Sequence, residues 1–185
     1  AAWRHAPHDR AVLIRRERAD DRPAVRRLHA AAFARAELEG AEAPEARLVD
    51  DLRETAAWLG RLSLVGEVED AVVGHVVCSR ATLEPGGRPV LGLGPIGVLP
   101  TWQGQGIGSA LMHAVLAAAG ALDEPLVCLL GEPDFYRRFG FEPAGRCGVL
   151  PPDPAWSAHF QIRPLDSWSE GMTGTFRYAE PFGDL

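Results

Sequence analysis

The stretch from Leu99 to Met112, LPTWQGQGIGSALM, places glycines at positions 104, 106 and 108 and then runs into an apolar pattern with helical spacing. Glycine weakens a helix, so three of them at the start of one require a reason. A helix N-terminus has unpaired N–H groups and a partial positive charge, and glycines let an anion such as phosphate approach it closely. The stretch predicts either an anion site at the mouth of a helix or, as the simpler alternative, a turn with a helix cap.

Neither of the two commonest phosphate-binding motifs fits this turn. A dinucleotide-binding GxGxxG would need a glycine where Ser109 stands, and a P-loop would need a lysine, a residue that the sequence does not contain. The pattern that does fit is QxxGxG, formed by Gln103, Gly106 and Gly108. The ligand is therefore expected to bind differently from a dinucleotide at a GxGxxG turn or a nucleoside triphosphate at a P-loop.

The segment immediately ahead of the turn is typical of a strand. It reads VLGLGPIGVL over residues 90–99 and contains three glycines and a proline. Pro95 has no N–H group to donate to a neighbouring strand, so it predicts a local break in the sheet. Such a break would leave main-chain groups unpaired next to the glycine turn.

Length and composition narrow the class of protein. With 185 residues, 46% of them hydrophobic and 24% charged, the chain is expected to form a single domain over residues 1–185, with residues 1–10 as an N-terminal arm that could be disordered. The net charge of −6 argues against a nucleic-acid partner. No apolar run reaches the roughly 20 residues that cross a bilayer. We find no signal peptide and expect a cytoplasmic location without membrane attachment.

The reactive side chains exclude further chemistry. Cys78, Cys128 and Cys147 match no common metal-binding spacing, and their odd number argues against a disulfide framework, so we expect no metal. Because the sequence lacks lysine, a Schiff-base mechanism is excluded.

Alternating and helical patterns place the remaining elements. A first strand is expected at 11–17, a hairpin at 61–83 that turns at Glu69-Asp70, and later strands at 125–130, 160–165 and 174–180. Helices are expected after the cap candidates Asp20 and Asp21, from Pro44 to Gly60, over 107–120, and briefly within 134–141. The second of these helices would present Leu48, Leu52, Thr55 and Leu59 on one face.

Three motifs together resemble one family. Besides QxxGxG, they are LGPIGVLP ahead of it and GEPDFYRRFGFEPA at 131–144, which is similar to a GxPxxYxRFGFxPA pattern. With these motifs the chain resembles the GCN5-related N-acetyltransferase (GNAT) superfamily, most closely its YhbS-like bacterial branch, from the first strand to the carboxyl end.

The resemblance implies a fold and a cosubstrate. The fold is an α/β GNAT fold, with a mixed, mostly antiparallel sheet of six to seven strands, about four helices, and a wedge where the fourth and fifth strands splay apart. Acetyl-coenzyme A would lie in the wedge, with its pantetheine on the broken strand and its diphosphate on the glycine turn. The residues assigned to cofactor binding are Ile96, Gly97, Val98, Gln103, Gly104, Gln105, Gly106, Ile107, Gly108, Ser109 and Asp134.

The same resemblance assigns Tyr136 the catalytic role of protonating the departing thiolate, with a packed aromatic residue as the alternative. Many relatives carry a glutamate base on the fourth strand, yet residues 90–99 contain no ionisable side chain. The base stays unassigned, with a water chain to Glu132, Asp134 or His75 as the options. Asp134 is also a candidate helix cap, and Arg137 and Arg138 are either a solvated helix face or partners for the nucleotide's 3′-phosphate.

The expected activity is transfer of acetyl from acetyl-CoA to a primary amine of a small molecule or peptide, by direct attack in a ternary complex. Two alternatives stay open: a non-catalytic acyl-CoA-binding or regulatory module, and a transferase of another acyl group. Exposed late strands in such folds often pair between subunits, so a homodimer is one candidate state. The acidic charge of the later part of the chain favours a cationic acceptor.

Overall fold

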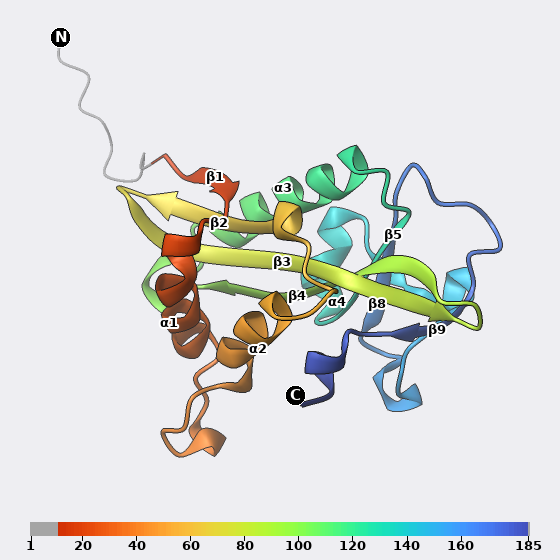
Figure 1. Cartoon of the computed structure of the whole chain (residues 1–185), viewed down its shortest axis with the longest axis horizontal. Coiled ribbons are helices and arrows are strands. Elements are labelled where there is room, and N and C mark those ends of the chain that lie inside the picture. The colour runs from red at the N-terminus through yellow and green to blue at the C-terminus, as the bar shows by residue number, and fades with distance from the viewer. Residues whose placement is uncertain (1–10, 185) are drawn as a thin grey trace, which may run out of the picture.

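The computed structural model describes residues 11–184, so the expected N-terminal arm lies outside the described residues (Figure 1). Within that range the α-helices are α1 (Arg22–Ala32), α2 (Pro44–Arg53), α3 (Ile107–Ala121) and α4 (Pro133–Tyr136). The strands are β1 (Leu13–Arg16), β2 (Ser63–Val68), β3 (Ala71–Glu84), β4 (Arg88–Val98), β5 (Leu126–Leu130), β6 (Glu142–Pro143), β7 (Val149–Leu150), β8 (Phe160–Pro164) and β9 (Gly174–Arg177).

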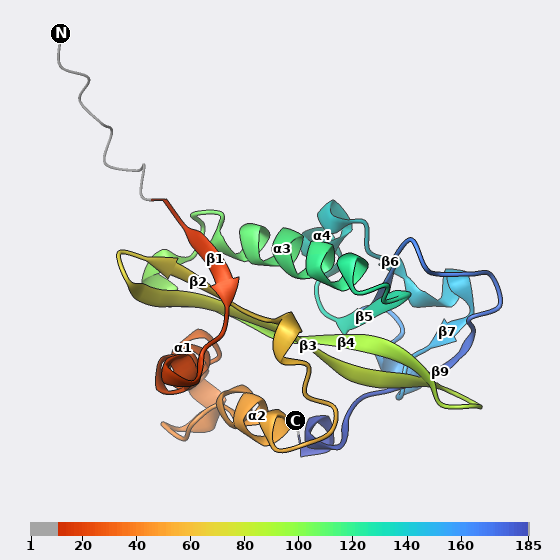
Figure 2. The same ribbon diagram turned by 45° about the horizontal axis from the view of Figure 1, so that its top comes forward.

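These strands form a single sheet between two layers of helices. Helices α1 and α2 cover one face and α3 and α4 cover the other (Figure 2). The order is β1-β2-β3-β4-β5-β8-β6, with β9 paired to β3 and β7 paired to β9. Only the β4–β5 and β7–β9 pairs are parallel. The described sheet has nine strands rather than six to seven, because β6 and β7 are two residues long and leave no recognisable pattern.

The predicted break in the sheet is confirmed. Strand β4 pairs with β5 only at Leu91 with Val127 and at Gly92 with Cys128. On its other side, the register with β3 shifts between Val76 and Cys78, opposite the position of Pro95. From that point β4 keeps β3 as a neighbour but has no partner in β5. The two strands therefore diverge into a wedge.

Helix α3 fixes the glycine turn against the sheet. It begins at Ile107, immediately after the turn, and its apolar face packs on β2, β3 and β4. Its fully buried residues, which continue the predicted stripe, are Ile107, Leu111, Met112, Val115 and Ala119. Since this face belongs to the main core, the N-terminus of α3 is held rigidly beside the end of β4.

Two details of the helices differ from the prediction. Helix α2 ends at Arg53, seven residues before the stop expected at Gly60, because the Thr55 hydroxyl donates to the Leu52 carbonyl (2.8 Å) and accepts from the Ala57 N–H (3.2 Å). These side-chain bonds replace the next helical turn. Asp21 does stand before α1, but its carboxylate accepts from Arg15 (2.7 Å) and does not cap the helix.

Candidate functional site

A cavity of about 610 Å³, here called the donor cavity, lies at the wedge. It contains ten of the twelve residues that the sequence assigns to the site, all except Gln105 and Asp134. Those ten are Ile96, Gly97, Val98, Gln103, Gly104, Gly106, Ile107, Gly108, Ser109 and Tyr136. Ala32, Phe33, Trp102, Phe135 and Arg138 complete the wall.

The glycine turn opens its main chain toward this cavity. Gly104 and Gly106 have φ of +74° and +83°, in the left-handed region that favours glycine, and no atom lies within 4 Å of where a Cβ would stand at either position. Within the described part of the chain, no acceptor takes a hydrogen bond from the N–H groups of residues 104–109. The first turn of α3 therefore presents a row of free donors at the positive end of a helix of fifteen residues.

Gln103 lines the donor cavity and also connects the glycine turn to the sheet. Its side-chain amide donates to the Val98 carbonyl at 3.0 Å and so ties the turn to the end of β4. The carbonyl of Val98, which we expected to be free for pantetheine, already has a partner in the chain. Gln105 likewise donates to the Thr101 carbonyl at 3.1 Å and lies outside the cavity lining.

Tyr136, the last residue of α4, lines the donor cavity. Its ring lies edge-on to Phe135 (4.9 Å between centroids) and Phe141 (5.9 Å). A Cβ at Gly131 would lie 2.4 Å from the ring, so glycine is needed there. Its hydroxyl forms no hydrogen bond to any other residue in the range 11–184. Burial raises the pKa of Tyr136 to about 12, which keeps the hydroxyl protonated and able to donate at neutral pH.

The carboxylates that sequence analysis considered near Tyr136 lie elsewhere. Asp134 has an 89% exposed side chain that faces Arg137 at 3.4 Å, and it makes no capping bond. Glu132 is 81% exposed and faces His159 at 3.8 Å. Neither residue lines the donor cavity. Arg138 does line it, with its guanidinium 4.6 Å above the Phe135 ring.

A second cavity of about 400 Å³, here called the acceptor cavity, adjoins the first. The two share Phe33, Ile96 and Tyr136. Its other lining residues are Glu45, Leu48, Leu93, Gly94, Pro95, Leu130, Trp156, Tyr178 and Phe182. Sequence analysis missed it, because its walls come from α1, α2, β4, β5 and the last residues of the chain.

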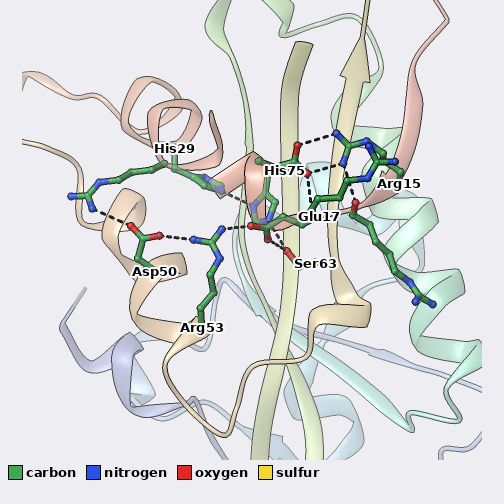
Figure 3. Close-up of polar contacts among 11 residues, drawn as sticks. Arg15, Glu17, His29, Asp50, Arg53, Ser63 and His75 are labelled. Carbon is green, nitrogen blue, oxygen red and sulfur yellow. Dashed lines mark hydrogen bonds and ion pairs between the residues drawn. The ribbon is translucent and has the colours of Figure 1, made fainter. Parts of the chain in front are cut away.

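A buried polar cluster lies on the α1–α2 side of the sheet (Figure 3). It consists of Glu17, His29, Arg53, Ser63 and His75. The Nε2 atom of His75 lies 2.9 Å from the Ser63 hydroxyl, which donates to Glu17, and Arg53 pairs with the same carboxylate. His75, a candidate base, lines neither cavity and is fully buried.

Burial also sets the protonation of this cluster. It lowers the pKa of His75 from 6.5 despite the opposing bond to Glu17, and lowers that of His29 well below 6.5. For Glu17, burial raises the pKa, but the hydrogen bonds from His75 and Ser63 outweigh it and leave the value below 4.5. The cluster therefore contains two neutral histidines, His29 and His75, next to the ion pair between Glu17 and Arg53.

The described residues were also compared with the requirements of a metal site and of a membrane-spanning helix. No group of three His, Cys, Asp or Glu side chains within residues 11–184 is arranged to hold a metal ion. No helix in the same range has the length and apolar character needed to span a membrane.

Comparison with known proteins gives a consistent picture. Residues 60–143, which run from β2 through the glycine turn to β6, match the family model "Acetyltransferase (GNAT) domain". The chain is 33% identical over 143 residues to the uncharacterized N-acetyltransferase YjhQ of Escherichia coli K12, covering 74% of this chain and 79% of the relative. It is also 33% identical over 140 residues to E. coli YhbS, covering 75% and 83%.

Solved structures agree in fold over almost the whole chain. A crystal structure of E. coli YhbS in complex with CoA matches with a TM-score of 0.84 and 30% identity, covering 97% of this chain and 96% of that one. A GNAT acetyltransferase from Brucella melitensis in complex with acetyl-CoA matches with a TM-score of 0.74 and 31% identity, covering 94% and 99%. The chain belongs to the GNAT family of acetyltransferases and is similar to its YhbS members.

Proposed function

We propose that this protein is an acetyl-CoA-dependent N-acetyltransferase that transfers the acetyl group to a primary amine by direct attack in a ternary complex. The observation that carries the proposal is the meeting of two cavities at Tyr136. One is lined by the helix N-terminus with its free N–H groups, and the other shares Tyr136, Phe33 and Ile96 with it. Two substrates can therefore approach a single proton donor together.

The donor cavity suits a nucleotide-bearing thioester. The N–H groups of residues 104–109 would bind the diphosphate, and the α3 dipole favours its negative charge. The pantetheine amides would then pair with the main chain of Ile96 and Gly97, where β4 has lost β5 as a neighbour, as an added strand would. Arg138, at the cavity wall, supplies the one guanidinium in the lining described here.

The amine, the thioester, Tyr136 and water account for every bond and proton in the transfer. The neutral amine nitrogen attacks the thioester carbonyl carbon and forms the C–N bond, the C–S bond then breaks, and the thiolate takes the proton of the Tyr136 hydroxyl. The amine releases a proton to water, and Tyr136 regains one from solvent. A thiol has a pKa of about 8.5 in water. Inside the wedge, burial raises it as it raises that of Tyr136, so the thiolate becomes a stronger base.

A second candidate function is an acyl-CoA-binding module without turnover. It is favoured by residues 90–99, which carry no ionisable side chain that could act as a base. Calorimetry with acetyl-CoA, combined with a thiol-release assay over a panel of amines, separates the two. Amine-dependent thiol release supports the transferase, whereas binding without release supports the module and overturns the proposal.

A further inference from the structure

The acceptor cavity has walls made of aromatic rings that the core holds in place. Tyr178 and Phe182 stack at 4.5 Å between centroids with an interplanar angle of 24°. Tyr178 in turn lies edge-on to the fully buried Phe176, at 4.6 Å. A Cβ at Gly92 of β4 would lie 3.1 Å from the Tyr178 ring. The ring pair is thus anchored to β4 and to the core before any ligand arrives.

The lining also includes apolar side chains that are partly exposed to solvent. Leu130, at the end of β5, is 41% exposed, although most large apolar side chains of the described chain are buried. Trp156 is half-buried and comes from the 3-10 helix Pro154–Trp156. A ligand with an apolar surface would cover both side chains and gain from their removal from water.

Among residues 11–184, the charge at the acceptor cavity is compensated. Glu45 is the one charged residue among the described residues of its lining, and its carboxylate accepts from Arg35 at 3.1 and 3.2 Å. Only 14% of the Glu45 side chain is exposed. The acidic charge of the chain, which favoured a cationic acceptor, is therefore not gathered at this cavity.

From this arrangement we infer that the acceptor is a compact primary amine carried on an aromatic body, with the ring held between Phe182, Tyr178 and Trp156 and the nitrogen directed toward Tyr136. The inference rests on the proposed function and names its substrate class. It also accounts for the lack of an ionisable side chain in residues 90–99. An ammonium group in an apolar cavity loses hydration, which lowers its pKa and favours the neutral nucleophile without a dedicated base.

The test compares four amines with the full chain at saturating acetyl-CoA: 2-phenylethylamine, spermidine, glucosamine and a lysine-containing tetrapeptide. Burying a phenyl ring removes roughly 150 Å² or more from water, so we expect kcat/KM for 2-phenylethylamine to exceed the others by at least about tenfold. An equal or higher value for any of the other three overturns the inference but leaves the transferase function intact.

One variant and a control test whether the acceptor cavity is responsible for this preference. Phe182→Ala should raise the KM for 2-phenylethylamine by about tenfold and leave the KM for acetyl-CoA unchanged, because Phe182 lines only the acceptor cavity. Leu150→Ala removes an apolar side chain that is 55% exposed and lines neither cavity, and it should change neither value.

A binding measurement keeps the inference testable if no amine reacts. Calorimetric titration of 2-phenylethylamine into the protein saturated with CoA should give binding that Phe182→Ala weakens. Binding without thiol release would overturn the proposed transferase while supporting the aromatic acceptor cavity. No binding would overturn the inference itself.

Discussion

The Nε2 atom of His29 lies 2.8 Å from the Nδ1 atom of His75, and both rings are fully buried between α1 and the sheet. The direction of the bonds follows from Ser63. Since its hydroxyl donates to Glu17, it accepts from His75 Nε2–H, and His75 Nδ1 accepts from His29 Nε2–H. This order leaves His29 Nδ1 as a bare lone pair, which has no hydrogen-bond partner. The fold requires both rings to be neutral.

Stability should therefore fall on mild acidification. The pKa of both histidines is below 6.5 in the folded chain, so below about pH 6.5 the unfolded chain binds protons that the native state does not. Stability is fully present above that pH and is lost as the pH falls toward the folded values. Urea unfolding between about pH 8 and pH 5 should show a decreasing free energy of unfolding, with the decline starting near the pKa of free histidine.

Two variants test whether His29 and His75 cause this pH dependence of the free energy of unfolding. His29→Leu removes one buried titrating group, so the pH dependence of the free energy of unfolding should become shallower, whatever its effect at pH 8. His159→Gln, whose side chain is 50% exposed, should leave the slope unchanged. An equally steep decline in the His29→Leu variant would contradict the assignment.

Arg53 should be among the most costly polar residues to remove. Its side chain is 3% exposed and pairs with Glu17, which is 5% exposed, so Arg53→Met leaves a buried carboxylate without its cation. We expect a loss of about 3–5 kcal/mol in the free energy of unfolding. Arg26→Met is the matched control, because Arg26 is 44% exposed where it pairs with Glu42 and Asp50, and it should cost less than about 1 kcal/mol. Equal effects in denaturant unfolding would show that Glu17 is stabilised without Arg53.

The glycine turn should tolerate side chains poorly for a conformational reason. Gly106→Ala places a side chain at a φ of +83°, which costs about 1–2 kcal/mol, and the turn is expected to relax and move its N–H groups. The dissociation constant for CoA should rise by about tenfold, measured by calorimetry. Gly120→Ala, inside α3 where a Cβ meets nothing within 4 Å, should stabilise the protein slightly and leave CoA binding unchanged. Unchanged CoA affinity in Gly106→Ala would remove the turn from the binding site.

Local signals in the sequence predicted the parts of the fold that short segments determine. The Glu69-Asp70 turn is confirmed, with φ of 49° and 64° at the two residues, as a tight hairpin connecting β2 and β3. Pro95 correctly predicted a local break in β4, because a missing N–H is a property of one residue, whereas the divergence of β4 from β5 was implied by the family resemblance. The predicted end of α2 was wrong. The hydrogen bond of the Thr55 hydroxyl ends the helix, although the apolar periodicity of the sequence continues beyond this residue.

Features built from distant segments could not be predicted in this way. His29, Ser63, His75 and Glu17 each look ordinary in the sequence, and only the packing of α1 on β3 and the pairing of β3 with β2 bring them together. The acceptor cavity has the same character, because Phe33 and Phe182 lie almost 150 residues apart in the chain yet line one space. Asp134 and Gln105 were assigned by position in a motif, and neither is among the residues that line the donor cavity.

Tyr136→Phe tests the chemistry most directly. The hydroxyl has no hydrogen-bond partner among the described residues, and the ring packing against Phe135 and Phe141 is retained in the variant. Stability and the dissociation constant for acetyl-CoA should therefore stay the same. Turnover should fall by about a hundredfold, at the low end of the range for a proton donor, because a thiolate needs only modest help to leave.

The control separates the two tyrosines at the wedge. Tyr178 lines the acceptor cavity but not the donor cavity, so Tyr178→Phe should act mainly on the KM for the amine, while Tyr136→Phe acts on kcat. If Tyr178→Phe instead loses kcat while Tyr136→Phe keeps full turnover, the proton donor is Tyr178. Full turnover in both variants would mean that water protonates the thiolate, which would leave Tyr136 only a packing role between the two cavities.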